Sequence, residues 1–198
     1  AGAGSGKTRV LTRRIAFLMS RRNVAPYQIL AITFTNKAAG EMKERVADLV
    51  GPIAKSMWVS TFHSACVRIL RQEATRLGYS NSFSIYDSAD SQRLITIVAK
   101  ELNLDAKRYP ARQFQSMISN AKNELLGPQD YLNAASNPFE QIVADVYAVY
   151  QQRLIRANAM DFDDLILKTV EVLQRYPEAK ARFRSRFRHV LVDEYQDT

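Results

Sequence analysis

The first eight residues of the chain, Ala1 to Thr8, have the composition of a phosphate-binding loop. Their sequence AGAGSGKT is rich in glycine, ends in Gly-Lys-Thr and is followed directly by an amphipathic helical pattern. Glycines let the backbone turn its N–H groups inward, and the N-terminus of the following helix adds partial positive charge where an anion would bind. Ala1 stands where the usual motif opens with glycine. A glycine-rich terminus without regular structure is the alternative interpretation.

The loop predicts a site for ATP and Mg²⁺. Lys7 is spaced to reach the β- and γ-phosphates, and the Thr8 hydroxyl is spaced to ligate Mg²⁺. The residues expected to cradle the nucleotide are Ala3, Gly4, Ser5, Gly6, Lys7 and Thr8.

The last ten residues contain the acidic partner that such a loop requires. An apolar run, His189 to Val192, leads into Asp193 and Glu194. This pattern predicts a buried parallel strand with carboxylates at its C-terminal edge, where open α/β sheets bind ligands. Asp193 is predicted to hold Mg²⁺, usually through water, and Glu194 to orient and deprotonate the attacking water. A Val-Asp-Glu tripeptide is weak alone, but combined with a phosphate-binding loop it indicates nucleotide hydrolysis.

Composition and charge narrow the class of protein. The chain has 198 residues, of which 46% are hydrophobic and 24% charged, as in ordinary globular proteins. Its net charge of +8 supports a polyanionic partner such as nucleic acid, although membrane-surface proteins share that sign. Cys66 is the only cysteine, which excludes an intrachain disulfide and favours a reducing, cytoplasmic compartment. No apolar run approaches the roughly 20 residues that span a bilayer, so no membrane association is expected.

Strand and helix patterns alternate over the first 86 residues, which predicts an α/β fold with a parallel, doubly wound sheet. Strands are predicted at 28–34, 58–62 and 83–86. One helix is predicted at 8–22, a second runs from a cap at Thr35-Asn36 to about residue 50, and a third follows the 58–62 strand and ends at residue 77. From 88 to about 157 the periodicity is helical, with helices predicted at 88–102, 111–125 and 138–157. Two further helices are predicted after this stretch, at 162–175 and 178–187. The phosphate-loop and acidic motifs lie at opposite ends of the chain, whereas a βαβ unit takes about 30 residues. The helical stretch is therefore interpreted as a domain inserted into the sheet.

Five motifs, in this order, resemble those of superfamily 1 DNA helicases of the UvrD/PcrA/Rep group. They are AGAGSGKT (1–8), AITFTNKAAGEM (31–42), WVSTFHSACVRIL (58–70), DFDDLI (161–166) and VLVDEYQDT (190–198). The residues between the motifs, such as ISNAKNELLGP (118–128), are similar to the group as well. The resemblance covers essentially the whole chain.

The resemblance implies a P-loop (RecA-like) ATP-binding domain at residues 1–85 and 160–198, with residues 86–159 as an inserted all-helical subdomain. It implies an enzyme that uses ATP and Mg²⁺ to move 3′ to 5′ along single-stranded DNA and to separate duplexes at junctions, in repair or replication. Unidentified repair proteins would be further partners. Arg9 would lie near the nucleotide, and Gln196 would sense the γ-phosphate and count among the catalytic residues with Lys7 and Glu194.

The 198 residues are expected to be a segment of a longer protein. A phosphate-binding loop normally follows a strand, and no strand precedes Ala1, while the chain stops directly after the acidic motif. The family's glutamine motif, arginine fingers and second RecA-like domain would lie outside the segment. The segment alone is therefore expected to be inactive as a helicase.

The turn Phe34-Thr35-Asn36 follows a predicted strand and should emerge at the same sheet edge as the nucleotide loop. Such a turn suits single-stranded DNA, with Phe34 stacking on a base and Thr35 and Asn36 bonding to phosphate. The alternative places Phe34 in the core and makes Asn36 only a helix cap. The residues alone do not decide between the two, and the resemblance favours DNA contact.

Thr61 and His63 end the next predicted strand at that same edge. A lone histidine is more often a structural hydrogen-bonding residue, which the residues alone favour here. The family's motif contacts the DNA backbone, so the resemblance implies that Thr61 and His63 bind DNA. A metal-binding role for His63 lacks the Cys/His cluster that such a site needs.

Two charged clusters have a structural interpretation. Asp161 is predicted to cap a helix with Asp163 and Asp164 in its first turn, in preference to an acidic metal site. Because this motif recurs in the family, a coupling role stays open. Four arginines alternate before the acidic strand: Arg182, Arg184, Arg186 and Arg188. Helical spacing distributes them around the axis, which favours a solvated surface over a phosphate-binding stripe.

Two other functions stay open. A P-loop ATPase that does not act on DNA would explain residues 1–8 and 190–194 but neither TFTNKAA nor TFHS. The helicase part of a helicase-nuclease would share every motif, and a nuclease motif downstream of Thr198 would distinguish it.

Overall fold

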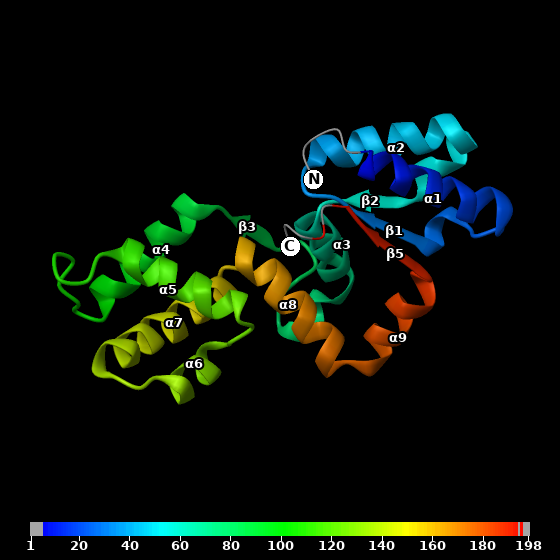
Figure 1. The fold of residues 1–198 in the computed structure, drawn as a ribbon. Coiled ribbons are helices and arrows are strands. Elements are labelled where there is room, and N and C mark those ends of the chain that lie inside the picture. Colours follow the sequence, from blue (N-terminus) through cyan, green and yellow to red (C-terminus); the bar gives the residue numbers. More distant parts are fainter. Residues whose placement is uncertain (1–5, 194, 196–198) are drawn as a thin grey trace. The chain divides into compact units, whose positions relative to one another are not determined.

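The computed structural model describes residues 6–193 and 195 of the chain (Figure 1). The helices are α1 (Lys7–Arg21), α2 (Asn36–Val50), α3 (Phe62–Glu73), α4 (Ser88–Glu101), α5 (Ala111–Asn123), α6 (Pro128–Ala134), α7 (Pro138–Arg156), α8 (Phe162–Arg175) and α9 (Pro177–Arg186). Short 3₁₀ helices are η1 (Pro26–Gln28), η2 (Pro52–Ser56) and η3 (Ala74–Leu77). The strands are β1 (Ile29–Ile32), β2 (Trp58–Ser60), β3 (Ser84–Tyr86), β4 (Ala159–Asp161) and β5 (His189–Val192).

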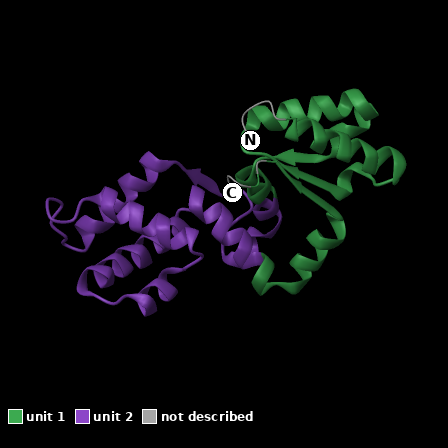
Figure 2. Ribbon diagram, in the orientation of Figure 1, with its two compact units in different colours: residues 1–68, 173–198 green, residues 69–172 purple. Residues whose placement is uncertain are grey.

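The chain divides into two compact units (Figure 2). Unit 1 comprises Ala1–Arg68 and Leu173–Thr198, and unit 2 comprises Ile69–Val172. Unit 2 thus interrupts unit 1 in the sequence. The bounds of the units fall at 68/69 and 172/173, where the predicted domains meet at 85/86 and 159/160.

Unit 1 is built on a parallel sheet with the strand order β2-β1-β5. All four residues of β1 are buried, as expected for a central parallel strand covered on both faces. The pairing is in register, with Ile32 opposite Ser60 of β2 and opposite Val192 of β5. The three strands therefore end at the same level.

Helices α1 and α2 pack side by side over one face of this sheet (Figure 1). The apolar stripe of α1, with Ile15 and Leu18, and that of α2, with Met42 and Val46, meet the buried residues of β1. This spacing of three and four residues is the helical pattern on which the sequence prediction rested.

Unit 2 is mainly helical. Its core lies among α4, α5 and α7 and contains the fully buried rings of Phe114, Tyr147 and Tyr150. A two-stranded parallel sheet, β3 with β4, pairs Tyr86 with Asp161.

Three details differ from the sequence prediction. The strand predicted at 83–86 exists as β3, but it belongs to the small sheet of unit 2 and does not join β2-β1-β5. Strand β4 and helix α6 were not predicted, because three and seven residues give too short a pattern for periodicity to be read. The strands predicted at 28–34 and 58–62 end earlier, at Ile32 and Ser60.

Candidate functional site

The described part of the predicted phosphate loop is Gly6, Lys7 and Thr8. Gly6 precedes α1 with a left-handed φ of 78°, a conformation that glycine adopts without steric cost. Lys7 and Thr8 are the first two residues of the helix and are half-buried. The helix N-terminus, with its partial positive charge, thus lies beside the lysine and the hydroxyl.

Asp193 follows β5 at the end of the sheet. Its backbone N–H donates to the carbonyl of Ile32 at 2.8 Å, which extends the ladder by one residue past the strand. Its side chain is buried and accepts a hydrogen bond from the Thr8 hydroxyl, 2.9 Å from Thr8 Oγ1 to Asp193 Oδ2. This bond joins the phosphate loop and the acidic strand across 185 positions of sequence.

The Thr8–Asp193 pair fits a magnesium site. Mg²⁺ is commonly bound through one or two protein oxygens together with substrate phosphates and water, rather than by a cage of protein ligands. A hydroxyl and a carboxylate oxygen that touch at the sheet edge supply this set. Among residues 6–193 and 195, no three His, Cys, Asp or Glu side chains cluster to hold a metal by themselves.

The other predicted nucleotide residues have different outcomes. Arg9 is exposed on α1, and its backbone carbonyl accepts a hydrogen bond from Thr12. The remaining five lie outside the described residues: Ala3, Gly4, Ser5, Glu194 and Gln196.

The predicted DNA residues of the first turn lie between β1 and α2. The Phe34 side chain is 67% exposed, so the alternative that it belongs to the core is wrong. Thr35 is the residue that caps α2, accepting the N–H of Ala38 at its hydroxyl (3.1 Å). Asn36 is exposed and is already the first residue of the helix, so the alternative of Asn36 as the cap is wrong as well.

The predicted DNA residues of the second turn lie where β2 passes into α3, with Thr61 between the two elements and His63 within the helix. Thr61 is half-buried, and its hydroxyl donates to the hydroxyl of Ser64 at 3.0 Å and accepts the N–H of Ser64 at 3.3 Å. His63 is half-buried in the first turn of α3. Because β1, β2 and β5 are parallel and in register, both turns and Asp193 follow strand ends at one edge of the unit 1 sheet.

Unit 2 contains a second carboxylate cluster, which has a different chemistry. Asp161 ends β4 and caps α8, accepting the N–H of Asp164 at 2.8 Å as predicted. Lys122 of α5 is buried between the two carboxylates, with its Nζ 2.7 Å from Asp161 and 2.9 Å from Asp164. Tyr150 donates to Asp161 at 2.8 Å, and Gln151 donates to Asp164 at 3.0 Å.

The buried charges perturb one another. Burial by itself would lower the pKa of Lys122, but the two adjacent carboxylates outweigh it and raise that pKa above its ordinary value. Burial likewise raises the pKa of Asp164, against the attraction of Lys122. Burial and the Asp161 carboxylate raise the pKa of Tyr150, so its hydroxyl stays a donor at neutral pH.

Lys122 was not identified from the sequence, although one signal was present. Phe114, Ile118 and Lys122 recur every four residues along α5, so the lysine occupies a core position of an amphipathic helix. A lysine at such a position must be paired, because a buried charge without a partner is costly. The acidic partners are 39 and 42 positions away, which local patterns do not reveal.

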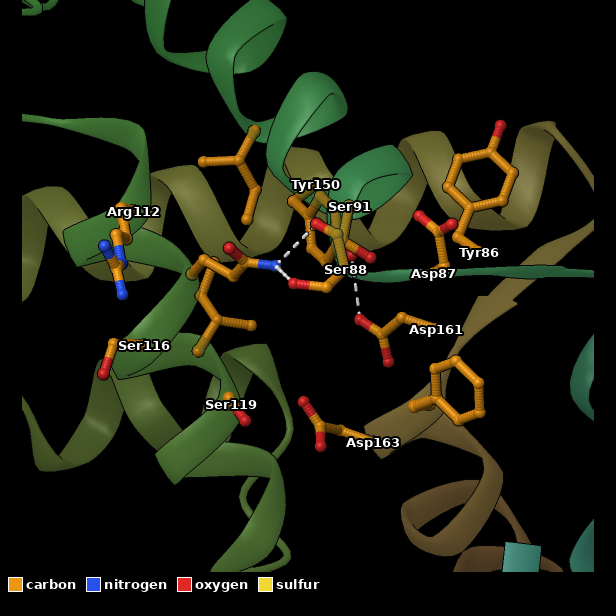
Figure 3. Close-up of a pocket in the computed structure, with 14 residues that line it drawn as sticks. Tyr86, Asp87, Ser88, Ser91, Arg112, Ser116, Ser119, Tyr150, Asp161 and Asp163 are labelled. Atoms are coloured by element: carbon orange, nitrogen blue, oxygen red, sulfur yellow. Dashed lines mark hydrogen bonds between the residues drawn. The ribbon is translucent and has the colours of Figure 1, made fainter.

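A cavity of about 340 Å³ lies beside this cluster (Figure 3). Its polar lining includes Ser88, Ser91, Arg112, Ser119, Asp161 and Asp163. Figure 3 shows Asp161 and Asp163 across the cavity from Arg112. The lining contains none of the residues predicted to bind nucleotide or DNA.

No helix within the described ranges combines the length and the apolarity needed to cross a bilayer.

Comparison with known proteins gives consistent matches. The UvrD/REP helicase N-terminal domain model matches residues 1–198. ATP-dependent DNA helicase UvrD1 of Mycobacterium tuberculosis H37Rv is 59% identical over 202 residues, covering 100% of this chain and 26% of that protein. ATP-dependent DNA helicase PcrA of Bacillus subtilis 168 is 52% identical over 198 residues, covering 100% of this chain and 27% of that protein. The chain therefore spans about a quarter of the length of these curated relatives.

Proposed function

This chain belongs to the UvrD/REP helicase family, and on that premise we propose that it carries half of the ATP site of an ATP-dependent DNA helicase. The protein would move 3′ to 5′ along single-stranded DNA and separate duplexes at junctions, in repair or replication. The Thr8–Asp193 hydrogen bond carries the proposal, because it joins the two motifs that a phosphate-hydrolysing site requires. The printed names of the relatives, ATP-dependent DNA helicases, agree with it.

The sheet of unit 1 would be the RecA-like ATP-binding core, formed by residues 1–85 and 160–198, with residues 86–159 as the inserted helical subdomain. The parallel β2-β1-β5 order and the interruption of unit 1 by a mainly helical unit support this division. In such a domain the ligands bind at the C-terminal ends of the strands.

The residues of the nucleotide site would divide the chemistry. The loop backbone and Lys7 would bind the phosphates, and Thr8 and Asp193 would hold Mg²⁺. The ion would offset charge that develops on the transferred phosphoryl group. Glu194 would accept the proton of the attacking water, and Gln196 would sense the γ-phosphate. Arg9, exposed two residues after Lys7, would lie near the nucleotide.

Single-stranded DNA would cross the same sheet edge. The exposed ring of Phe34 is suited to stack on a base, and the hydroxyls of Thr35 and Thr61 with Asn36 and His63 are suited to the backbone. Because these turns and Asp193 follow adjacent strand ends, nucleotide and DNA would sit on one rigid element. This proximity would let hydrolysis and DNA binding influence each other.

Replacing Lys7 in the full-length protein tests the proposal. Lys7→Ala should abolish ATP turnover measured with saturating single-stranded DNA, because the phosphates lose their main cationic partner. Lys55→Ala is the matched control. Lys55 is an exposed lysine in η2, which precedes the N-terminal end of β2 and is therefore away from the C-terminal strand ends where the nucleotide would bind. Near-normal turnover in Lys7→Ala would refute the phosphate-loop assignment.

The two alternatives predict different responses to DNA. A P-loop ATPase that does not act on DNA would hydrolyse ATP at the same rate with and without single-stranded DNA. A helicase-nuclease would show stimulation together with strand cleavage. Stimulation without cleavage is the result expected here.

A further inference from the structure

Arginines are concentrated at the edge of the unit 1 sheet opposite the candidate nucleotide site. Residues 179–190 contain no Asp or Glu and five basic side chains: Lys180, Arg182, Arg184, Arg186 and Arg188. They lie on α9 and in the turn that leads into the N-terminal end of β5 (Figure 1). Although helical spacing favoured a solvated surface, the contacts of these arginines are more specific.

Two guanidinium groups rest on one indole ring. The Cζ atom of Arg68 lies 3.9 Å from the centroid of Trp58, and that of Arg186 lies 4.7 Å from it. Arg186 also lies 5.4 Å from the ring of Phe187, which in turn packs 4.8 Å from Trp58. Arg68 comes from α3 and Arg186 from the end of α9, so the tertiary structure brings them together.

A third arginine repeats this arrangement one helical turn away. The Cζ atom of Arg182 lies 4.9 Å from the ring of Phe183. Arg182 and Arg186 are four residues apart on α9 and so share a helix face. Arg184, two residues from each, is rotated by about 200° to the other side of the helix.

The stacked rings are themselves buried, since Trp58 is 3%, Phe183 6% and Phe187 9% exposed. They pack against the guanidinium groups and, being buried, offer little ring surface to a ligand. A guanidinium held in this way can direct its N–H fork at the paired oxygens of a phosphate.

The two arginines on Trp58 repel each other. Partial burial and then the charge of Arg186 lower the pKa of Arg68. Among the described residues, no carboxylate lies within salt-bridge distance of Arg186. An anion bound close to both groups would relieve this repulsion.

We propose that Arg68, Arg182 and Arg186 form a second DNA-binding surface that takes the phosphodiester backbone of duplex DNA. This surface extends the proposed DNA-binding function to the opposite edge of the sheet from Phe34, Thr35, Asn36, Thr61 and His63, the residues that the sequence predicts to bind DNA. Single-strand sites combine positive charge with exposed aromatic rings, whereas duplex backbone binding needs the charge alone. A protein partner would instead favour exposed aromatic anchors with few charges at the centre, the reverse of this surface.

The test measures binding of the full-length protein to a blunt duplex of about 30 base pairs between about 50 and 200 mM salt. In the double variant R68Q/R186Q, the slope of log K against log salt should become shallower by about 2, since each lost phosphate contact contributes about 0.9. The loss should be the same for duplexes of different sequence. Arg184→Gln removes the same charge from the other side of α9 and should change the slope by much less than 1.

Further measurements distinguish the loss of phosphate contacts from other causes of weaker duplex binding. R68K/R186K keeps both charges but not the planar forks, so it should retain the wild-type slope while binding more weakly at each salt concentration. A slope in this variant as shallow as that of R68Q/R186Q would show that charge at these positions does not bind the duplex and would overturn the proposal. Unchanged duplex binding in R68Q/R186Q, or equal loss in Arg184→Gln, would also overturn it. Loss of binding to a poly-glutamate peptide with duplex binding intact would identify an acidic protein as the partner instead.

Stimulation of ATP hydrolysis by single-stranded DNA should survive in R68Q/R186Q, and its absence in the wild type would count against the proposed helicase function separately.

Discussion

Each unit of the chain has a carboxylate at the end of a parallel strand, but the side chains that surround the two carboxylates differ. In unit 1 Asp193 follows a parallel strand and accepts a hydrogen bond from Thr8, a neutral hydroxyl. In unit 2 Asp161 ends a parallel strand and, with Asp164, surrounds the ammonium group of Lys122. Both sites join residues that are far apart in the sequence, but the second is closed around a lysine that is itself fully buried.

This difference separates the proposed ligand site from a structural one. A carboxylate beside a hydroxyl at the C-terminal edge of a parallel sheet lies where such sheets bind ligands, and the two groups offer oxygen atoms of the kind that Mg²⁺ prefers. The charges of Asp161 and Asp164 are already paired with the fully buried ammonium group of Lys122, so an added cation would have to displace it. The acidic motif 161–164 is therefore better explained by the stability of unit 2 than by metal binding, in agreement with the capping interpretation.

The largest expected effect on stability comes from removing the ammonium group of Lys122. Lys122→Met should lower the free energy of unfolding of unit 2 by about 3–5 kcal/mol, because Asp161 and Asp164 are left buried without a counter-charge. Arg153→Met, which breaks a half-exposed pair with Glu101, should cost at most about 1 kcal/mol. Urea unfolding followed by far-UV circular dichroism measures both changes in the 198-residue chain.

Two observations sharpen this test. Trp58 is the only tryptophan and lies in unit 1, so its fluorescence should shift much less than the helical signal. Removing the carboxylate charges as well, with K122M/D161N/D164N, should restore most of the stability, since a fully neutral cluster carries no unpaired charge. A single variant Lys122→Met as stable as wild type would mean that the cluster is solvated.

A smaller effect on folding is expected at the other site. Thr8→Val should lower the free energy of unfolding by only about 0.5–1.5 kcal/mol, the net contribution of one hydrogen bond. In the full-length protein the same variant should lose nearly all Mg²⁺-dependent ATP turnover, because the proposed metal loses its hydroxyl ligand. Thr8→Ser keeps the hydroxyl and should retain turnover. If Thr8→Val lowered the free energy of unfolding as much as Lys122→Met does, the Thr8–Asp193 pair would be structural, and the two sites would not differ in role.

The smallest effect on folding is expected at Phe34. Because its ring is exposed, Phe34→Ala should leave thermal unfolding nearly unchanged, whereas Phe114→Ala in the core of unit 2 should cost about 3–5 kcal/mol. In the full-length protein Phe34→Ala should weaken single-stranded DNA binding by about 1–3 kcal/mol, the usual cost of losing one stacking aromatic. Unchanged affinity in a fluorescence anisotropy titration would remove Phe34 from the proposed DNA site.

Much of unit 1 was accessible from local patterns. The β1 residues Ile29 to Ile32 form an apolar run, and α1 and α2 repeat apolar residues every three or four positions, so their element types follow from periodicity. The common edge of Phe34, Thr61 and Asp193 then follows from a rule of topology, because parallel strands end on the same side. The order and composition of the motifs are enough to identify the family.

The contacts that distinguish the two carboxylate sites were decided by the tertiary structure. Nothing local pairs Lys122 with Asp161, or stacks Arg68 and Arg186 on one indole ring, because each contact joins elements that only folding brings together. Charge patterns in the sequence state which groups exist but not the dielectric around them. Folding places the carboxylates of Asp161 and Asp164 around a buried lysine and the carboxylate of Asp193 beside a hydroxyl, and this difference in surroundings sets their chemistry.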